Sequence, residues 1–143
     1  MCKKERGKTV LKKVSMIPTL FVAIFALSTI SKLVSAQEWV PYVPCPEQVE
    51  LYYWTVDKWA YINVTITCAT PCYQFDWGTV SRDRLQLWAD AKIWRFTGPC
   101  ILVITKFRHV YELGQLKHGK TYTFTFKVWG YSIKSITFKH LPR

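Results

Sequence analysis

The sequence predicts one small all-β domain, and three observations support this prediction. Apolar and polar residues alternate in several short segments, and a period of two is typical of strands with one buried face. Turn-forming residues separate these segments. The 143 residues include seven tryptophans, eight tyrosines and eight phenylalanines, which is ample apolar volume for the core of a single domain.

A leader of different composition precedes this domain. Residues 1–36 begin with a stretch rich in lysine, continue with the apolar run Met16–Ile30, and close on Val34-Ser35-Ala36. This order is that of a secretory signal: a basic region, a helical apolar core and a small-residue cleavage site. We therefore expect a signal peptide over 1–36, cleavage before Gln37 and a domain over 37–143. The alternative is an N-terminal membrane anchor that is not cleaved.

The leader accounts for more than half of the formal net charge of +11. It holds seven of the 20 lysines and arginines and one of the nine acidic residues, so the remaining chain carries +5. Such a mild excess is weak evidence for nucleic-acid or membrane binding. We expect a secreted or cell-surface protein that binds no specific nucleic acid. It would meet a membrane only through its N-terminal segment, if that segment is retained.

About seven strands are expected after residue 37. They are Gln48–Trp54, Trp59–Cys68, Tyr73–Trp77, Leu85–Ile93, Ile101–Arg108, Thr121–Trp129 and Tyr131–Phe138. Their number and spacing are those of an immunoglobulin-like antiparallel β-sandwich, with a small barrel as the alternative. In the last strand the apolar parity shifts between Ile133 and Ile136, which predicts a β-bulge.

Four cysteines lie in the expected domain: Cys45, Cys68, Cys72 and Cys100. An even number in a short exported domain predicts two disulfides. If the first hairpin is centred near Asp57, Cys45 faces the position next to Cys68, and these two residues form the expected first pair. Cys72–Cys100 then follows by elimination, and a local Cys68–Cys72 bond is the competing connectivity. A zinc site is the less favoured alternative because no second close Cys/His pair exists.

The single asparagine of the chain is also a candidate for modification. Asn63-Val64-Thr65 is an N-glycosylation sequon. Alternation places Asn63 on the wet face of its strand together with Tyr61 and Thr67. A glycan at Asn63 would therefore point into solvent.

No catalytic constellation stands out in residues 37–143. The three histidines there lack the spacing of metal ligands, and the serines lie outside any nucleophile motif. A glycine-rich phosphate loop is also missing from the sequence. We therefore expect a protein that is not an enzyme and that uses no metal and no cofactor.

The most informative surface is expected on the strand Leu85–Ile93. If its odd-numbered apolar residues face the core, then Trp88, Lys92 and Trp94 face outward. Two large rings beside a cation are candidates for a binding surface for a protein or carbohydrate partner. The alternative is that another part of the domain covers them.

Three phrases of the sequence carry a resemblance to a known kind of domain. Gly98-Pro99-Cys100-Ile101, Tyr111-Glu112-Leu113-Gly114 and Gly119-Lys120-Thr121-Tyr122-Thr123-Phe124 follow one another in that order. This order resembles small immunoglobulin-like or fibronectin-like β-sandwich domains of exported prokaryotic proteins, many of unassigned function. The resemblance covers about residues 60–138. It implies an architecture and transfers no catalytic residue.

These observations favour a secreted or cell-surface binding or interaction module without catalytic activity. One alternative is a structural subunit of a surface layer or filament, in which an edge strand pairs with a neighbouring copy. The other alternative is a protease inhibitor that presents a disulfide-braced loop such as Thr97–Cys100.

Overall fold

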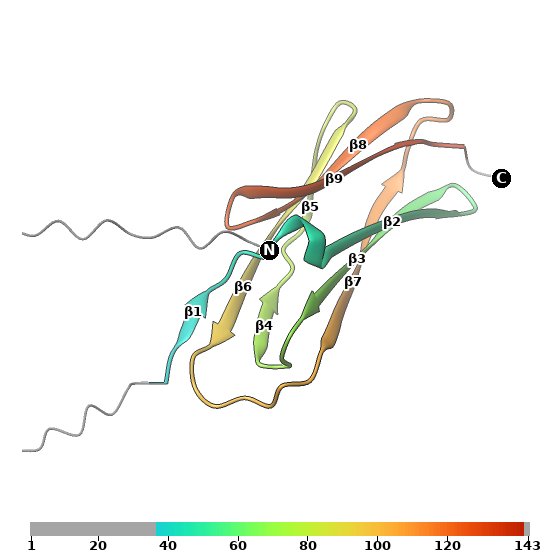
Figure 1. Ribbon diagram of the computed structural model, residues 1–143. Coiled ribbons are helices and arrows are strands. Elements are labelled where there is room, and N and C mark those ends of the chain that lie inside the picture. Colours follow the sequence, from blue (N-terminus) through green and yellow to red (C-terminus); the bar gives the residue numbers. More distant parts are fainter. Residues whose placement is uncertain (1–36, 142–143) are drawn as a thin grey trace, which may run out of the picture. The chain divides into compact units, whose positions relative to one another are not determined.

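The computed structural model describes residues 37–141, which fold almost entirely as β-strands (Figure 1). The expected signal peptide over 1–36 and the helix in it lie outside the described residues. No helix between residues 37 and 141 is long and apolar enough to cross a membrane. The prediction of an all-β domain is confirmed.

Nine strands form two sheets, and a single 3-10 turn, η1 (Pro46–Gln48), precedes β2. The larger sheet contains β1 (Trp39–Pro41), β4 (Tyr73–Asp76), β5 (Val80–Asp83), β6 (Gln86–Phe96), β8 (Thr121–Val128) and β9 (Tyr131–Lys139). The smaller sheet contains β2 (Val49–Val56), β3 (Trp59–Cys68) and β7 (Thr105–Gln115), in the order β2-β3-β7. Strand β6 organises the larger sheet because it pairs with β1, β4, β5 and β8.

One core fills the space between the sheets, an arrangement consistent with a β-sandwich (Figure 1). Strands β3, β6 and β8 each turn alternate residues into this core, as their period of two predicts. The fully buried members are Ala60, Ile62, Val64, Ile66, Leu87, Ala89, Ala91, Ile93, Tyr122, Phe124, Phe126 and Val128. The predicted inward faces of these three strands are therefore confirmed, apart from Leu85, which is 43% exposed in the turn before β6.

The strand count and pairing differ from the prediction in three places. The short strands β1 and β5 are additional, and β5 lies in the segment between the expected strands Tyr73–Trp77 and Leu85–Ile93. Strands β6 and β8 pair in parallel, so the sheets are not purely antiparallel. Strand β7 starts at Thr105 instead of Ile101, because its partner β3 ends at Cys68, which is paired with Thr105. The apolar run Ile101–Ile104 is consequently a loop.

The β8–β9 hairpin contains the predicted bulge. Its turn residues Trp129 and Gly130 have φ angles of 53° and 78°, the left-handed conformation that a tight two-residue hairpin requires. Phe126 pairs with Lys134 whereas Lys127 pairs with Ser132, so Ile133 is the extra residue. The shift in apolar parity beside Ile133 has this cause.

One predicted disulfide is confirmed and the other is wrong. Cys72 is bonded to Cys100 with a Cα–Cα distance of 6.2 Å, so the β4 start is tied to the loop after β6. Cys68 is a free cysteine, 1% exposed in the core, which excludes both the Cys45–Cys68 pair and a Cys68–Cys72 bond. The hairpin register is one residue away from the expected register. In addition, η1 turns the chain between Cys45 and β2, so the two strands do not continue side by side as far as Cys45.

Candidate functional site

A row of three aromatic rings lies on the outer face of the smaller sheet. Tyr52 and Trp54 are two residues apart on β2 and so project on the same face, and Trp54 is paired directly with Tyr61 on β3. The Tyr52 and Trp54 ring centroids are 5.9 Å apart with planes inclined by 24°, and those of Trp54 and Tyr61 are 5.6 Å apart at 20°. We call these three residues the aromatic row. Its end residue, Tyr52, is 65% exposed.

A hollow of about 500 Å³ opens beside the aromatic row, lined by Tyr52, Trp54, Asn63 and Arg108. Asn63 is paired with Tyr52 across the two strands, and its Nδ2 donates a hydrogen bond of 3.0 Å to Oγ1 of Thr65. This bond orients the amide. Arg108, on β7, contributes a guanidinium with five N–H donors and a permanent charge. The hollow therefore combines aromatic surface, one amide and one cation.

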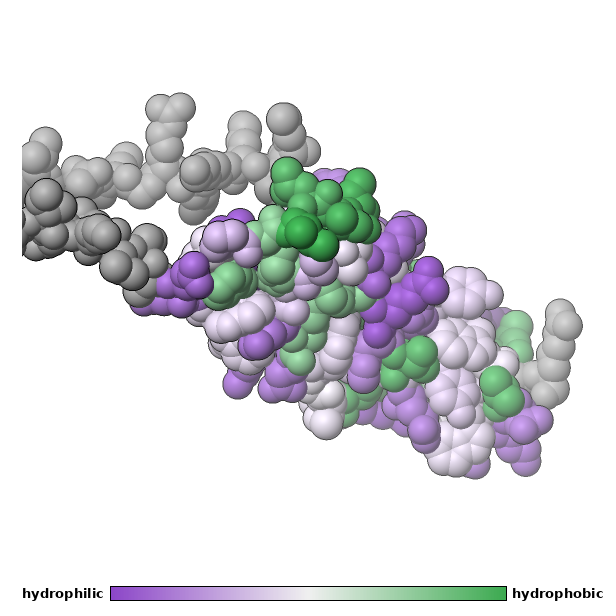
Figure 2. All heavy atoms as spheres, turned by 90° about the horizontal axis from the view of Figure 1, so that it is seen from below, coloured by the Kyte–Doolittle hydropathy of each residue, from purple (hydrophilic) through white to green (hydrophobic). Residues whose placement is uncertain are grey.

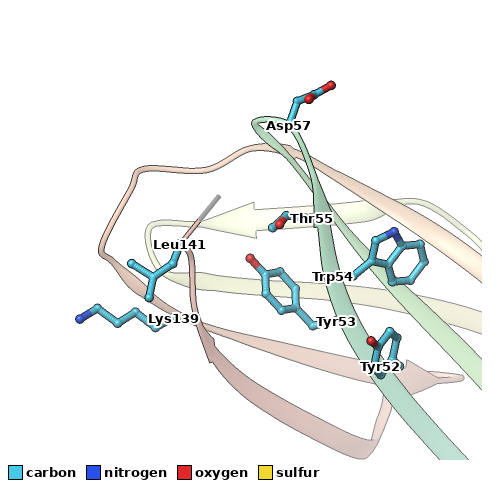
Figure 3. Close-up of a pocket in the computed structure, with 7 residues that line it drawn as sticks. All are labelled: Tyr52, Tyr53, Trp54, Thr55, Asp57, Lys139 and Leu141. Atoms are coloured by element: carbon cyan, nitrogen blue, oxygen red, sulfur yellow. The ribbon is translucent and has the colours of Figure 1, made fainter. Parts of the chain in front are cut away.

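A second hollow of about 490 Å³ lies at the seam between β2 and β9 (Figure 3). Tyr53 points toward this seam, where Leu141 lies, whereas Trp54 projects from the other side of β2 (Figure 3). The Tyr53 ring stacks on Phe138 with a centroid distance of 3.9 Å. Asp57 and Lys139 are the charged residues that line this hollow.

The seam also contains the buried histidine of the domain. The Tyr53 hydroxyl lies 2.8 Å from Nδ1 of His140, while Nε2 of His140 is buried without a hydrogen-bond partner. Burial lowers the pKa of His140, and nearby His118 lowers it further. Burial also raises the pKa of Tyr53. Both groups are therefore held neutral, which is the state expected of a structural contact between the sheets.

The predicted residues Trp88, Lys92 and Trp94 project from β6 away from the core, but they do not form one cluster. Trp94 meets the ring of Trp129 edge-on at 5.2 Å, and the Lys92 ammonium lies 5.9 Å from the centre of that same ring. Trp88 is covered separately by Lys127, at 5.4 Å. Six residues of extended chain separate the two predicted tryptophans, roughly 20 Å at the rise of a strand. The structure thus brings Lys92 and Trp94 together and leaves Trp88 apart.

The alternation of the sequence does not reveal the aromatic row or the contribution of Trp129. Alternation did place Tyr61 and Asn63 on a wet face, and Tyr52 and Trp54 fell within an expected strand. The missing information was the cross-strand register, which brings Trp54 beside Tyr61. The role of Trp129 could not be predicted because this residue occupies a left-handed turn position, where a large side chain is rare.

Among residues 37–141 no three His, Cys, Asp or Glu side chains gather as metal ligands would. Compared with known proteins, the chain matches no family model, no curated protein sequence and no solved structure. The function is therefore inferred from the surfaces of the domain itself.

Proposed function

We propose that the chain is an exported, non-catalytic binding module of immunoglobulin-like architecture whose ligand site is the hollow beside the aromatic row. The observation that supports this proposal is the near-parallel arrangement of the exposed Tyr52 ring with the half-buried rings of Trp54 and Tyr61, next to Arg108. Large rings held in order at a surface are typical of binding sites. The hollow is shallow and open to solvent, so a ligand would lie along the sheet surface and would not be enclosed.

The chemistry of the hollow favours a saccharide that carries an acidic group. Tyr52 offers an open aromatic surface against which the apolar face of a sugar ring can pack. Arg108 is suited to a carboxylate because its planar fork can donate two parallel hydrogen bonds. The amide of Asn63 can pair with sugar hydroxyls.

Export is supported by the leader sequence and by the Cys72–Cys100 disulfide, which is typical of proteins from oxidising compartments. We propose that the mature chain begins at Gln37 and is secreted or displayed at the cell surface. N-terminal sequencing of the exported protein tests this point. A chain that retains residue 1 in the membrane fraction would show that the leader is an anchor.

Titration with acidic and neutral polysaccharides tests the ligand proposal. Arg108→Gln should weaken binding of the acidic saccharide by about tenfold or more, since a charge-assisted pair contributes ~1.5–3 kcal/mol. Tyr52→Ala should also weaken it, because it removes the aromatic surface against which the sugar ring packs. Tyr131→Ala is the matched control, because Tyr131 is an equally exposed tyrosine (67%) on β9, in the larger sheet. Equal binding by wild type and Arg108→Gln, or equal affinity for neutral and acidic saccharides, would contradict the proposed ligand class.

One observation favours a structural subunit as the second candidate. The 11-residue strand β7 pairs with β3 on one side, and no described strand pairs with its other side. Such an edge can add a strand from another copy. A concentration series on size-exclusion separates the two functions: a monomer at all concentrations favours the module, and growing assemblies favour the subunit.

A further inference from the structure

The loop between β6 and β7 exposes four consecutive aliphatic residues. Ile101, Leu102, Val103 and Ile104 are 67%, 87%, 53% and 76% exposed. The loop lies at the lower end of the domain in Figure 1, and the space-filling view from that side shows a compact, protruding hydrophobic patch (Figure 2). We call residues 101–104 the apolar tip. Runs of this kind on a soluble surface are unfavourable unless they have a partner.

The apolar tip is held in place by its neighbours. The disulfide between Cys100 and Cys72 fixes the residue that precedes it. Within the loop, the Val103 amide donates to the carbonyl of Ile101 at 3.2 Å, and the Thr105 hydroxyl donates to the carbonyl of Val103 at 2.9 Å. Two tip carbonyls are thereby satisfied internally, which lowers the free-energy cost of moving this backbone from water into a lipid environment.

Two basic residues lie near the apolar tip. Arg95, on β6, lines a hollow of about 400 Å³ together with Cys100. Lys106 follows the tip at the start of β7 and is exposed. Glu38, an acidic residue, also lies near this end because its backbone bonds to Thr97. Arg95 and Lys106 are suited to pair with anionic lipid headgroups.

The start of the described chain lies at the same end of the domain. Glu38 and Thr97 exchange hydrogen bonds: the Glu38 amide donates to Thr97 Oγ1 at 2.9 Å, and the Thr97 amide donates to the Glu38 carbonyl at 2.9 Å. In the sequence, six residues separate the apolar run Met16–Ile30 from Gln37. The first described residues thus lie at the end of the domain that carries the apolar tip.

From these observations we infer that the apolar tip inserts into the interface of a membrane that contains anionic lipid. The occupant of the surface is lipid: four aliphatic side chains enter the acyl region while Arg95 and Lys106 remain at the headgroups. This contact is additional to any made by the N-terminal segment. It also stands independently of the saccharide hollow, since it uses none of the residues that line it.

Hydrogen–deuterium exchange with vesicles of phosphatidylcholine and phosphatidylglycerol tests the inference on the full chain as purified. A retained leader would by itself hold the chain on vesicles, so the deciding readout is local. Amides of residues 101–104 should become protected when vesicles are added, while those of the β8–β9 turn should not change. Unchanged exchange at residues 101–104 in vesicle-bound protein would overturn the inference.

Paired variants provide the second measurement. Leu102→Asp with Ile104→Asp should abolish that protection, and should lower vesicle affinity about tenfold or more in protein whose leader has been removed by processing. Val56→Asp with Leu141→Asp adds the same charge at two other exposed aliphatic residues (both 52% exposed) and should retain the protection. If both double variants lose the protection of residues 101–104, the cause is general charge repulsion and the inference is overturned. Protection of residues 101–104 by a protease or another protein, but not by vesicles, would overturn it as well.

Discussion

The hydroxyl of Tyr53 and Nδ1 of His140 lie 2.8 Å apart, and this contact joins β2 of the smaller sheet to the residue that follows β9 of the larger sheet. The backbone of His140 is fixed on the other side: its amide donates to the Lys120 carbonyl at 2.9 Å, and its carbonyl accepts from the Gly119 amide at 2.8 Å. The side chain and the backbone of one buried histidine thus connect three segments that are distant in the sequence.

This arrangement predicts a loss of stability in mild acid. The folded-state pKa of His140 is lowered from its ordinary value of 6.5 by burial and by His118. The unfolded chain therefore binds a proton at a higher pH than the folded chain does. The free energy of unfolding should be highest above pH 6.5 and should fall as the pH decreases through the lowered pKa. Urea unfolding at a series of pH values between 7.5 and 4.5, about the range in which histidines titrate, measures this slope.

Two variants identify the group responsible. His140→Leu should reduce the slope between pH 7 and 5 most because it removes the buried imidazole, and His118→Ala should reduce it less. His109, whose pKa is also lowered by burial, should account for slope that remains. Tyr53→Phe should cost ~1–2 kcal/mol near neutral pH, since His140 loses its hydrogen-bond partner in a buried site. An unchanged slope in His140→Leu would assign the acid sensitivity to other residues.

The cysteines give a chemical prediction. Burial raises the pKa of the Cys68 thiol to about 11, so folded protein should resist alkylation at Cys68 and unfolded protein should react readily. Non-reducing peptide mapping should recover Cys72 linked to Cys100. Replacing both with serine should cost ~3–4 kcal/mol, the chain-entropy expectation for cysteines 28 residues apart. A Cys68–Cys72 peptide in the map would contradict the described connectivity.

The two outward tryptophans of β6 should differ in their effect on stability. Trp94 packs against Trp129, so Trp94→Ala should cost ~1–2 kcal/mol, less than the 3–5 kcal/mol of a fully buried tryptophan. Trp88 is contacted by the ammonium group of Lys127, and Trp88→Ala should lower the free energy of unfolding by less than Trp94→Ala does. Because the two residues share no partner, the double variant should show additive costs in a thermal melt. A collapse of the fold would identify them as core residues and remove them as candidates for a binding surface.

Alternation predicted the core well because one buried face is a local property of the sequence. The inward residues Ile62 and Val64 of β3, and Phe124 and Phe126 of β8, follow directly from a period of two. Pairing is not local in this way. A register error of one residue was enough to suggest a disulfide for Cys68, which is a free cysteine, and the correct register was also needed to find the aromatic row.

The apolar run Ile101–Ile104 shows a second limit of such analysis. A continuous aliphatic stretch is typical of a buried strand. The last residue of the partner strand β3, however, is paired with Thr105, so no residue of β3 lies opposite Ile101–Ile104. Hydrophobicity alone does not distinguish a segment that is buried within the domain from one that is exposed at its end. The difference depends on strand length and on the Cys72–Cys100 bond, both of which are properties of the folded chain.

Asn63 connects the modification prediction to the proposed binding site. Its side chain lines the hollow beside Tyr52 and Trp54, so an N-linked glycan would place its first sugar in the space proposed for the ligand. Expression in a glycosylating host should give a mass increase that disappears in Thr65→Val, which removes the sequon and retains Asn63. Since the chain contains one asparagine, the mass change assigns the site directly.

Glycosylation and ligand binding should therefore exclude each other. The glycosylated protein should not bind the acidic saccharide, whereas unglycosylated protein from a bacterial host should bind it. Protein from the same glycosylating host grown with an inhibitor of N-glycosylation is the control for expression background. It should bind as the bacterial protein does, because its sequence is unchanged and the Thr65 hydroxyl that orients the Asn63 amide is retained. Equal saccharide binding with and without the glycan would show that the ligand lies elsewhere, and it would then favour the Lys92–Trp94–Trp129 cluster on the larger sheet as the site to test next.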